Sequence, residues 1–205
     1  MEDLVFYTNP QSRGQIVRWM LEEVDAEYVT VILEYGTSMK AQDYLQINPM
    51  GKVPALQYGD TIITETPAIC AWLAEQFPQK HLTPPLGSPE RAAYLRWLFF
   101  AAGPLETALT AKAFDWQTPN PGAIGFGTYE DTVNTLETAL TPGPYLCGKQ
   151  FTAADVYLGS CINWGLLFGT LDSRAVFDDY VQRLNARPAA RRAFELDEDL
   201  RRVRR

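Results

Sequence analysis

The first third of the chain alternates short apolar runs with one amphipathic stretch. An apolar run in residues 3–8 predicts a buried strand, which ends at the turn-forming pair Asn9-Pro10. In residues 12–24 apolar side chains recur every four positions, which predicts a helix. The alternating, β-branched run at 28–33 predicts a second strand. The chain therefore begins as strand, helix, strand, the core of a βαβ unit.

The next segment predicts a weak helix, two short strands and a stronger helix, at residues 35–47, 52–56, 61–63 and 66–77. Gly59 lies between the two strands and suits the positive φ of a tight hairpin turn. Pro67 falls in the first turn of the last helix, where a missing N–H costs nothing, and Pro78 marks the end of that helix. These elements predict a mixed four-stranded sheet with helices.

A change of composition marks a domain boundary, because proline and glycine crowd residues 81–89. Beyond it helices are predicted at residues 90–109, 129–140, 152–168 and 174–185, with a kink in the first at Gly103-Pro104. The predicted fold is an α/β N-terminal domain, a linker and an all-α C-terminal helical domain, at residues 1–80, 81–89 and 90–205.

Charge and hydropathy argue against two classes of function, nucleic-acid binding and membrane insertion. The chain has 205 residues, 46% of them hydrophobic, with a net charge of −7 and a pI of about 4.8. A nucleic-acid binder is usually basic. The one basic cluster, residues 201–205 with Arg191 and Arg192 before it, is interpreted as a solvated tail or one that folds back onto an acidic surface, with a weak nucleic-acid or membrane contact as the alternative. No apolar run approaches the roughly 20 residues of a membrane span, and the acidic N-terminus lacks signal-peptide features. We expect a cytoplasmic protein that binds neither nucleic acid nor membrane.

Metal and histidine chemistry are not expected. Cys70, Cys147 and Cys161 have no metal-like spacing and lie in apolar contexts, so they are interpreted as reduced core residues. The single histidine, His81, falls in the predicted linker.

Residues 151–156 predict the start of a helix on physical grounds alone. Thr152 as N-cap and Asp155 three positions later form a capping box, flanked by Phe151 and Val156 as a hydrophobic staple. Asp155 is therefore interpreted as structural, and its loss is expected to cost about 1 kcal/mol or more.

Three further segments carry motifs. They are Phe6-Tyr7-Thr8-Asn9-Pro10-Gln11-Ser12-Arg13-Gly14, Asn48-Pro49-Met50-Gly51-Lys52-Val53-Pro54-Ala55-Leu56 and Thr64-Glu65-Thr66-Pro67-Ala68-Ile69. In this order and at these separations they resemble the glutathione transferases, whose N-P-x-G-K-V-P-x-L the second approaches and whose E-S-x-A-I the third fits with threonine for serine. The resemblance covers nearly the whole chain. It implies a thioredoxin-like first domain, glutathione as co-substrate and a two-fold homodimer.

The resemblance also implies how glutathione is bound. Val53, before a cis Pro54, presents its N–H and C=O to the cysteinyl part of glutathione. At a helix N-terminus Thr66 holds the γ-glutamyl carboxylate, and Glu65 meets the ammonium. Lys52 is either a partner of the glycyl carboxylate or a solvated charge. On the residues alone, Pro54 also suits a plain turn and Thr66 an ordinary helix cap.

The residue that activates the thiol is open. A free thiol has a pKa of about 8.5, and lowering it by about two units needs roughly 2.7 kcal/mol of differential stabilisation. Ser12 resembles the hydroxyl of serine-type members, yet suits a plain N-cap. Tyr7 resembles the residue of tyrosine-type classes, yet suits a core aromatic. Arg13 adds positive charge or binds a carboxylate, and Thr8 and Asn9 are further donors. Disulfide-forming members of the family carry a reactive cysteine in this turn, and this chain has none there, so the resemblance disfavours a mixed-disulfide mechanism. We predict Ser12 first and Tyr7 second.

The helical domain is expected to contribute the electrophile-binding site. Tyr94, Trp97 and Phe100 are the predicted aromatic lining, with helix core as the alternative for each. The predicted function is a glutathione transferase that directs the glutathione thiolate at an electrophile or a peroxide, without a metal. The alternative is a non-catalytic interaction or regulatory protein of the same fold.

Overall fold

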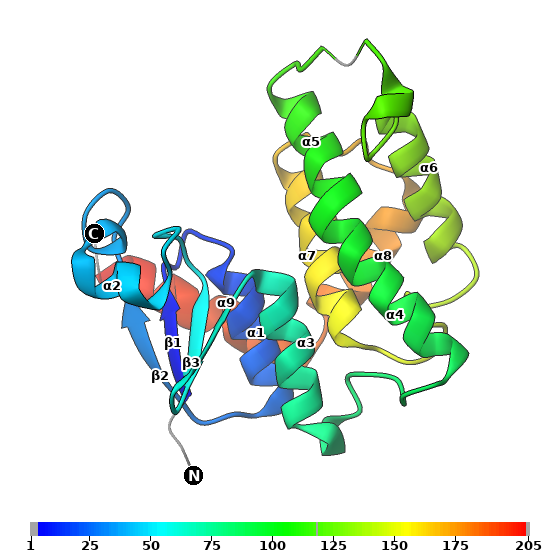
Figure 1. The fold of residues 1–205 in the computed structure, drawn as a ribbon. Helices are drawn as coiled ribbons and strands as arrows, with labels where there is room; N and C mark the ends of the chain where they lie inside the picture. Colours follow the sequence, from blue (N-terminus) through cyan, green and yellow to red (C-terminus); the bar gives the residue numbers. More distant parts are fainter. Residues whose placement is uncertain (1–3, 118, 204–205) are drawn as a thin grey trace. The chain divides into compact units, whose positions relative to one another are not determined.

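The computed structural model describes residues 4–117 and 119–203, which form two compact units (Figure 1). The first unit holds the chain up to Lys80 together with the segment from Arg187 onward, and the second runs from His81 to Ala186. The first unit is α/β and the second is helical, which is the predicted fold class. Among the described residues no helix is long and apolar enough to cross a membrane.

A mixed four-stranded sheet lies at the centre of the first unit. Its strand order is β2 (Tyr28–Ile32), β1 (Leu4–Thr8), β3 (Ala55–Tyr58) and β4 (Thr61–Thr64). β1 pairs parallel with β2 and antiparallel with β3, and β3 pairs antiparallel with β4. The parallel pair requires a crossover, which α1 (Gly14–Val24) supplies. The β3–β4 hairpin closes at Gly59, whose φ of 56° confirms the predicted positive value.

Alternate residues of β1 point to opposite faces of the sheet. Phe6 is buried on the face that α1 covers, where α3 (Thr66–Gln76) packs beside α1 (Figure 1). Tyr7 lies on the other face. There it packs against a buried cluster that includes Tyr44 of the short helix α2 (Gln42–Ile47), and the other members are Leu33, Met39 and Ala55. The stretch at residues 35–47, which predicted only a weak helix, therefore contains α2, and α2 covers the second face of the sheet.

A C-terminal helix that the sequence analysis missed completes the first unit. α9 (Pro188–Val203) packs along α1, so the helix predicted at residues 174–185 is present, but the prediction that it is the final one is wrong. Its buried side consists largely of small residues such as Ala189 and Ala193. Because the sequence shows no strongly apolar face there, it predicts a solvated tail for the arginine-rich segment. The alternative that this segment folds back onto acidic groups is correct for Arg192, whose Nε lies 3.2 Å from Glu22 Oε2. Residues 204–205 of the predicted tail lie outside the described residues.

Two further ion pairs join the C-terminal segment to α1. Arg187 donates from Nε and Nη2 to the two carboxylate oxygens of Glu23, at 2.6 and 2.8 Å. Arg18 Nε donates to Asp197 Oδ1 at 2.7 Å, and the two side chains are only 3% and 1% exposed. Burial raises the pKa of Asp197, although the Arg18 charge acts in the opposite direction. Desolvation therefore offsets much of the attraction within the buried pair.

Replacing one partner of this pair leaves the other charge buried without its counter-charge. We expect Arg18→Met and Asp197→Leu each to lower the free energy of unfolding by about 3–5 kcal/mol. The double variant should lose less than the sum of the two, because an apolar pair needs no counter-charge. Urea unfolding of the parent, both single variants and the double variant measures the coupling. Strictly additive losses would show that the two side chains do not act as a pair.

The second unit contains α4 (Pro89–Phe100), α5 (Glu106–Ala113), α6 (Tyr129–Leu140), α7 (Ala153–Leu167) and α8 (Ala175–Asn185). The helix predicted over 90–109 is broken by the π-helical turn η3 (Ala101–Leu105), which contains Pro104. Proline has no N–H for the helical ladder, and the Thr107 hydroxyl donates to the Gly103 carbonyl at 2.8 Å. A π-helical turn therefore occupies the position of the predicted kink at Gly103-Pro104, and the kink itself stays a prediction.

Asp155 ties the start of α7 to two other segments of the helical unit. Its Oδ1 accepts from the Leu146 N–H at 2.9 Å and from the Tyr180 hydroxyl at 2.8 Å. Its Oδ2 accepts from the Thr152 N–H at 2.8 Å and from the Thr152 hydroxyl at 3.0 Å. The predicted capping box is confirmed. Burial raises the pKa of the Asp155 carboxyl, and the Leu146 N–H opposes that rise.

The structure raises the expected cost of losing this carboxylate. Asp155→Ala leaves several buried donors without an acceptor, so we expect the free energy of unfolding to fall by about 3 kcal/mol or more. Asp131→Ala is the matched control. Asp131 occupies the same position of α6, 2.7 Å from the hydroxyl of its N-cap Thr128, but is exposed. Its loss should cost about 1 kcal/mol or less. Equal losses in chemical unfolding would contradict the role of the buried network.

Candidate functional site

Strand register brings three predicted segments to one edge of the sheet. Tyr7, near the end of β1, lies opposite Ala55 at the start of β3, which in turn lies opposite Thr64 at the end of β4. The turn that contains Ser12 follows β1, the pair Val53-Pro54 precedes β3, and α3 begins directly after β4. Neighbouring strands are about 4.8 Å apart. These segments therefore meet at one edge, which we call the site edge and define by Thr8, Ala55 and Thr64.

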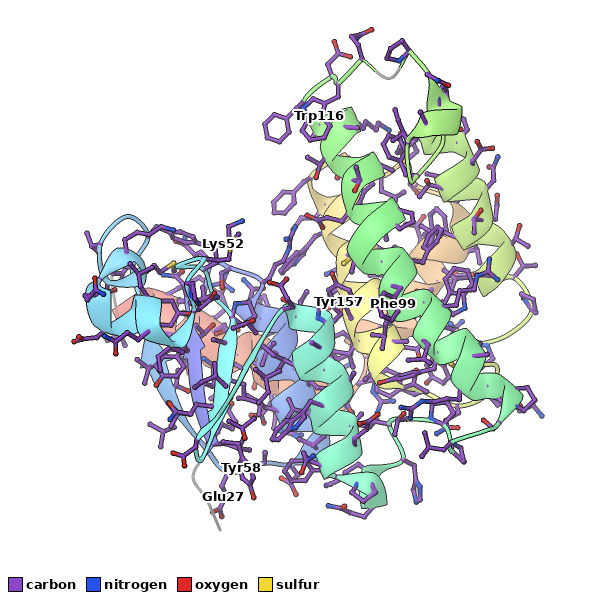
Figure 2. All side chains as sticks on the ribbon, viewed as in Figure 1. Glu27, Lys52, Tyr58, Phe99, Trp116 and Tyr157 are labelled. Carbon is purple, nitrogen blue, oxygen red and sulfur yellow. The ribbon has the colours of Figure 1, made fainter. Side chains whose placement is uncertain are left out.

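Figure 2 shows both edges of this sheet. Lys52 lies at the site edge, whereas Glu27 and Tyr58 lie at the opposite one. The Lys52 side chain is exposed, so it brings a solvated positive charge to the site edge.

Ser12 closes the turn between β1 and α1. Its Oγ donates to the Asn9 carbonyl at 2.7 Å and accepts from the Gly14 N–H at 2.9 Å. The Ser12 N–H donates to the same carbonyl at 3.1 Å. Arg13 is exposed at the N-cap position of α1. The contacts of Ser12 are thus those of a cap for the first turn of α1, at the helix end where N–H groups favour negative charge.

The two further predicted donors of this turn, Thr8 and Asn9, are buried. Asn9 Nδ2 donates to the Leu33 carbonyl at 2.8 Å, and its Oδ1 accepts from the Gln11 N–H at 3.0 Å. Both ends of the Asn9 amide therefore hold the turn in place, and this residue is a structural element of the site.

Tyr7 has the contacts of a core aromatic. Its hydroxyl donates to Gln57 Oε1 at 2.8 Å, and its ring is tilted against the Tyr44 ring with the centroids 5.6 Å apart. The side chain lies in the cluster under α2 and is half-buried. The phenolic proton is therefore directed to a neighbour within the sheet.

The loop before β3 is fixed by two donors that the sequence analysis did not single out. The Tyr44 hydroxyl and Asn48 Nδ2 both donate to the Lys52 carbonyl, at 2.6 and 2.8 Å. Gly51 has a φ of 58°, and the predicted cis bond between Val53 and Pro54 is present. Tyr44 precedes Asn48 by four residues, about one helical turn. That spacing was visible in the sequence, but neither residue type by itself pointed to the loop.

The N-terminus of α3 has an unusual backbone. Glu65, the N-cap residue, has a φ of 67°, a left-handed value that costs a non-glycine residue roughly 1 kcal/mol or more. The exposed Glu65 side chain makes no capping hydrogen bond to the described part of the chain. Thr66 is 6% exposed and begins the helix. First-turn N–H groups of such a helix are free of intrahelical partners, and they face an anion when one binds.

The predicted aromatic lining of the second-substrate pocket belongs to α4. Tyr94 and Trp97 are buried and Phe100 is half-buried. The Trp97 and Phe100 rings meet edge to face at 5.4 Å, and the Arg96 guanidinium lies 4.5 Å from the Trp97 ring centroid. Trp97 also lines an open groove of about 560 Å³ beside α6. The role of these three aromatic residues in binding an electrophile stays a prediction.

The cysteines occupy the core positions expected of them. Cys70, Cys147 and Cys161 are all buried thiols that form no disulfide. Burial raises the pKa of the Cys147 thiol to about 11, which disfavours its thiolate. Within residues 4–117 and 119–203 no group of three or more His, Cys, Asp and Glu side chains is placed to hold a metal ion.

Comparison with known proteins gives a consistent family. Residues 12–76 match the family model described as glutathione S-transferase, N-terminal domain. The chain is 30% identical to glutathione S-transferase GstA of Escherichia coli O157:H7 over 84% of this chain and 87% of that protein. Elongation factor 1-gamma 1 of Oryza sativa subsp. japonica is also 30% identical, over 66% of this chain but only 35% of that protein.

Solved structures show the same similarity along the chain. A glutathione transferase from Methylococcus capsulatus str. Bath has a TM-score of 0.78 at 27% identity, covering 95% of this chain and 98% of that one. A glutathione transferase homologue from Sulfitobacter, solved with bound glutathione, has a TM-score of 0.76 at 27% identity with the same coverage.

Gly51 offers a direct test of the loop geometry. A Cβ at Gly51 would lie 2.6 Å from the Met39 carbonyl oxygen, in addition to the strain of its positive φ. Gly36 is the matched control, because its φ is also positive, 73°, but a Cβ there meets nothing within 4 Å. We expect Gly51→Ala to lower the free energy of unfolding by about 1–3 kcal/mol more than Gly36→Ala. Equal losses in urea unfolding would show that Gly51 is not held against the Met39 backbone.

Proposed function

This chain belongs to the glutathione S-transferase superfamily, and we propose that it binds glutathione at the site edge and activates the thiol for attack on an electrophilic or peroxide substrate. The observation that carries the proposal is the register of β1, β3 and β4, which gathers the Ser12 turn, the Val53-Pro54 pair and the start of α3. A tripeptide with two carboxylates, an ammonium and a thiol needs complementary groups from such separate segments.

Each segment then has a distinct part in binding. The first-turn N–H groups of α3 and the Thr66 hydroxyl receive the γ-glutamyl carboxylate, and the exposed Glu65 carboxylate meets the ammonium. Val53 pairs its backbone with the cysteinyl residue as an added strand would. The exposed Lys52 ammonium attracts the glycyl carboxylate.

Ser12 is the proposed thiol activator. It stands at the N-terminal end of α1, where the helix favours a thiolate over a neutral thiol. The Gly14 N–H already donates to Ser12 Oγ, and this polarisation strengthens the hydroxyl as a donor. Arg13 adds a positive charge at the same helix end. Tyr7 is the weaker candidate, because its hydroxyl donates to Gln57.

One observation favours a second candidate function. The similarity to elongation factor 1-gamma 1 of Oryza sativa subsp. japonica spans 66% of this chain, so a fold of this kind also occurs inside a protein with a different name and a greater length. The second candidate is an interaction or regulatory module without turnover. The two functions differ in one measurable property, the ionisation of a bound glutathione thiol.

Titration of the protein with glutathione tests the proposal. We expect saturable binding by calorimetry and a bound thiol whose pKa, followed by thiolate absorbance, lies well below its free value. Ser12→Ala should raise the pKa of the bound thiol by about one to two units relative to the parent complex. A hydrogen bond to a charged acceptor contributes about 1.5–3 kcal/mol, which corresponds to that shift.

Two variants serve as references. Ser12→Thr keeps a hydroxyl and should keep the lowered pKa, whereas Tyr7→Phe should leave it unchanged if Ser12 is the donor. A pKa that rises in Tyr7→Phe and not in Ser12→Ala would reassign the donor to Tyr7. Binding without any shift of the thiol pKa would favour the module, and no binding would refute the transferase proposal.

A further inference from the structure

The carbonyl of Lys52 has both of its acceptor positions occupied by buried donors. The Tyr44 hydroxyl donates to it at 2.6 Å and Asn48 Nδ2 at 2.8 Å. The donors are 4% and 5% exposed. A carbonyl oxygen has two lone pairs. The Tyr44 and Asn48 donors occupy both, so they fix the direction of the Lys52 carbonyl.

Fixing that carbonyl also fixes the N–H of the next residue. The only cis peptide bond among the described residues is the one between Val53 and Pro54, so the Lys52–Val53 peptide is trans. In a planar trans peptide the N–H points opposite to the C=O. Because the Lys52 C=O points at Tyr44 and Asn48, the Val53 N–H points away from them.

The two donors are themselves held in place. The Tyr44 ring packs against the Tyr7 ring within the cluster under α2. Burial raises the pKa of Tyr44 to about 12, so its hydroxyl keeps its proton throughout the neutral range. Asn48 Oδ1 accepts from the Met50 N–H at 3.1 Å, which sets the amide orientation. The Asn48 carbonyl accepts from the Gly51 N–H at 2.8 Å.

We propose that Tyr44 and Asn48 are positioning residues for glutathione: by holding the Lys52 carbonyl they aim the Val53 N–H at the cysteinyl backbone of the bound tripeptide. This inference rests on the proposed function. It also gives Tyr7 a role as support for the Tyr44 ring. Tyr44 and Asn48 affect the affinity for glutathione, whereas the Ser12 turn affects the pKa of the bound thiol.

Tyr44→Phe removes one donor and keeps the buried ring. We expect the dissociation constant for reduced glutathione, measured by calorimetry, to rise about fivefold, as loss of one hydrogen bond of ordinary strength predicts. The pKa of the bound thiol at saturating glutathione should equal that of the parent. In turnover the same variant should raise KM for glutathione with little change in kcat.

Tyr28→Phe is the matched control. Its hydroxyl donates to Glu22 at 2.8 Å, and burial raises its pKa to about 12 as well. Tyr28 pairs with Leu4, at the edge of the sheet opposite the site edge. The Tyr28 hydroxyl also accepts from Arg18 Nη1 at 3.2 Å, so Tyr28→Phe should lower the free energy of unfolding at least as much as Tyr44→Phe, and only Tyr44→Phe should weaken glutathione binding.

Asn48→Ser provides a second, independent variant. It removes the amide donor while a serine oxygen still accepts from the Met50 N–H in the turn. It too should weaken glutathione binding with the bound thiol pKa unchanged. If the parent protein binds glutathione and both variants bind it as tightly, the inference is overturned while the proposed function stands. If Tyr44→Phe and Tyr28→Phe weaken binding equally, the effect is general destabilisation and the inference is also overturned. If the parent does not bind glutathione, both proposals fail.

Discussion

Antiparallel pairing of β1 with β3 is the constraint on which the candidate site depends. Because Tyr7 pairs with Ala55, and Ala55 with Thr64, the end of one strand, the beginning of the next and the end of the third lie side by side. A shift of register by one residue would move Leu4 and Phe6 off the face that α1 covers and would separate the three segments. The apolar residues of the strand, which only one register buries, therefore also determine which polar groups meet. The composition of the candidate site therefore follows from core packing.

Two sets of contacts hold the segments of the site edge, and a third holds α1, which follows the Ser12 turn. Asn9 holds the turn after β1, with hydrogen bonds from both ends of its amide. Tyr44 and Asn48 hold the loop before β3 from the second face. α9 holds α1 through the buried Arg18–Asp197 pair and the outer pairs of Arg187 and Arg192. The first two sets join residues no more than 24 positions apart, but the ion pairs join residues more than 160 positions apart. The C-terminal segment is thus part of the unit that carries the candidate site.

The sequence predicted the elements that depend on local pattern. The sheet, α1, α3 and the helices of the second unit follow from apolar periodicity, and the predicted capping box of Asp155 is present. α9 could not be found in this way, because alanines form much of its buried side and its arginines find partners only after folding. Tyr44 was missed for a similar reason. Its hydroxyl donates to a backbone carbonyl, and every residue has such a carbonyl, so the sequence does not indicate which one is the acceptor. The sequence motif identified the loop before β3, whereas the side chains that orient this loop could be recognised only from the structure.

A single hydroxyl proton links the stability of α1 to the proposed chemistry. Ser12 Oγ has one proton to donate, and the Asn9 carbonyl receives it. If that proton is redirected to a glutathione sulfur, the carbonyl keeps the Ser12 N–H and Oγ keeps the Gly14 N–H, so the turn loses one bond worth about 1 kcal/mol. A hydrogen bond to a charged acceptor contributes about 1.5–3 kcal/mol, whereas a hydrogen bond to a neutral thiol, which is a weak acceptor, contributes less. The exchange is favourable for the thiolate alone. A site that favours only the ionised form lowers the thiol pKa, so under the proposed function the existing cap contact would make the Ser12 turn selective for thiolate.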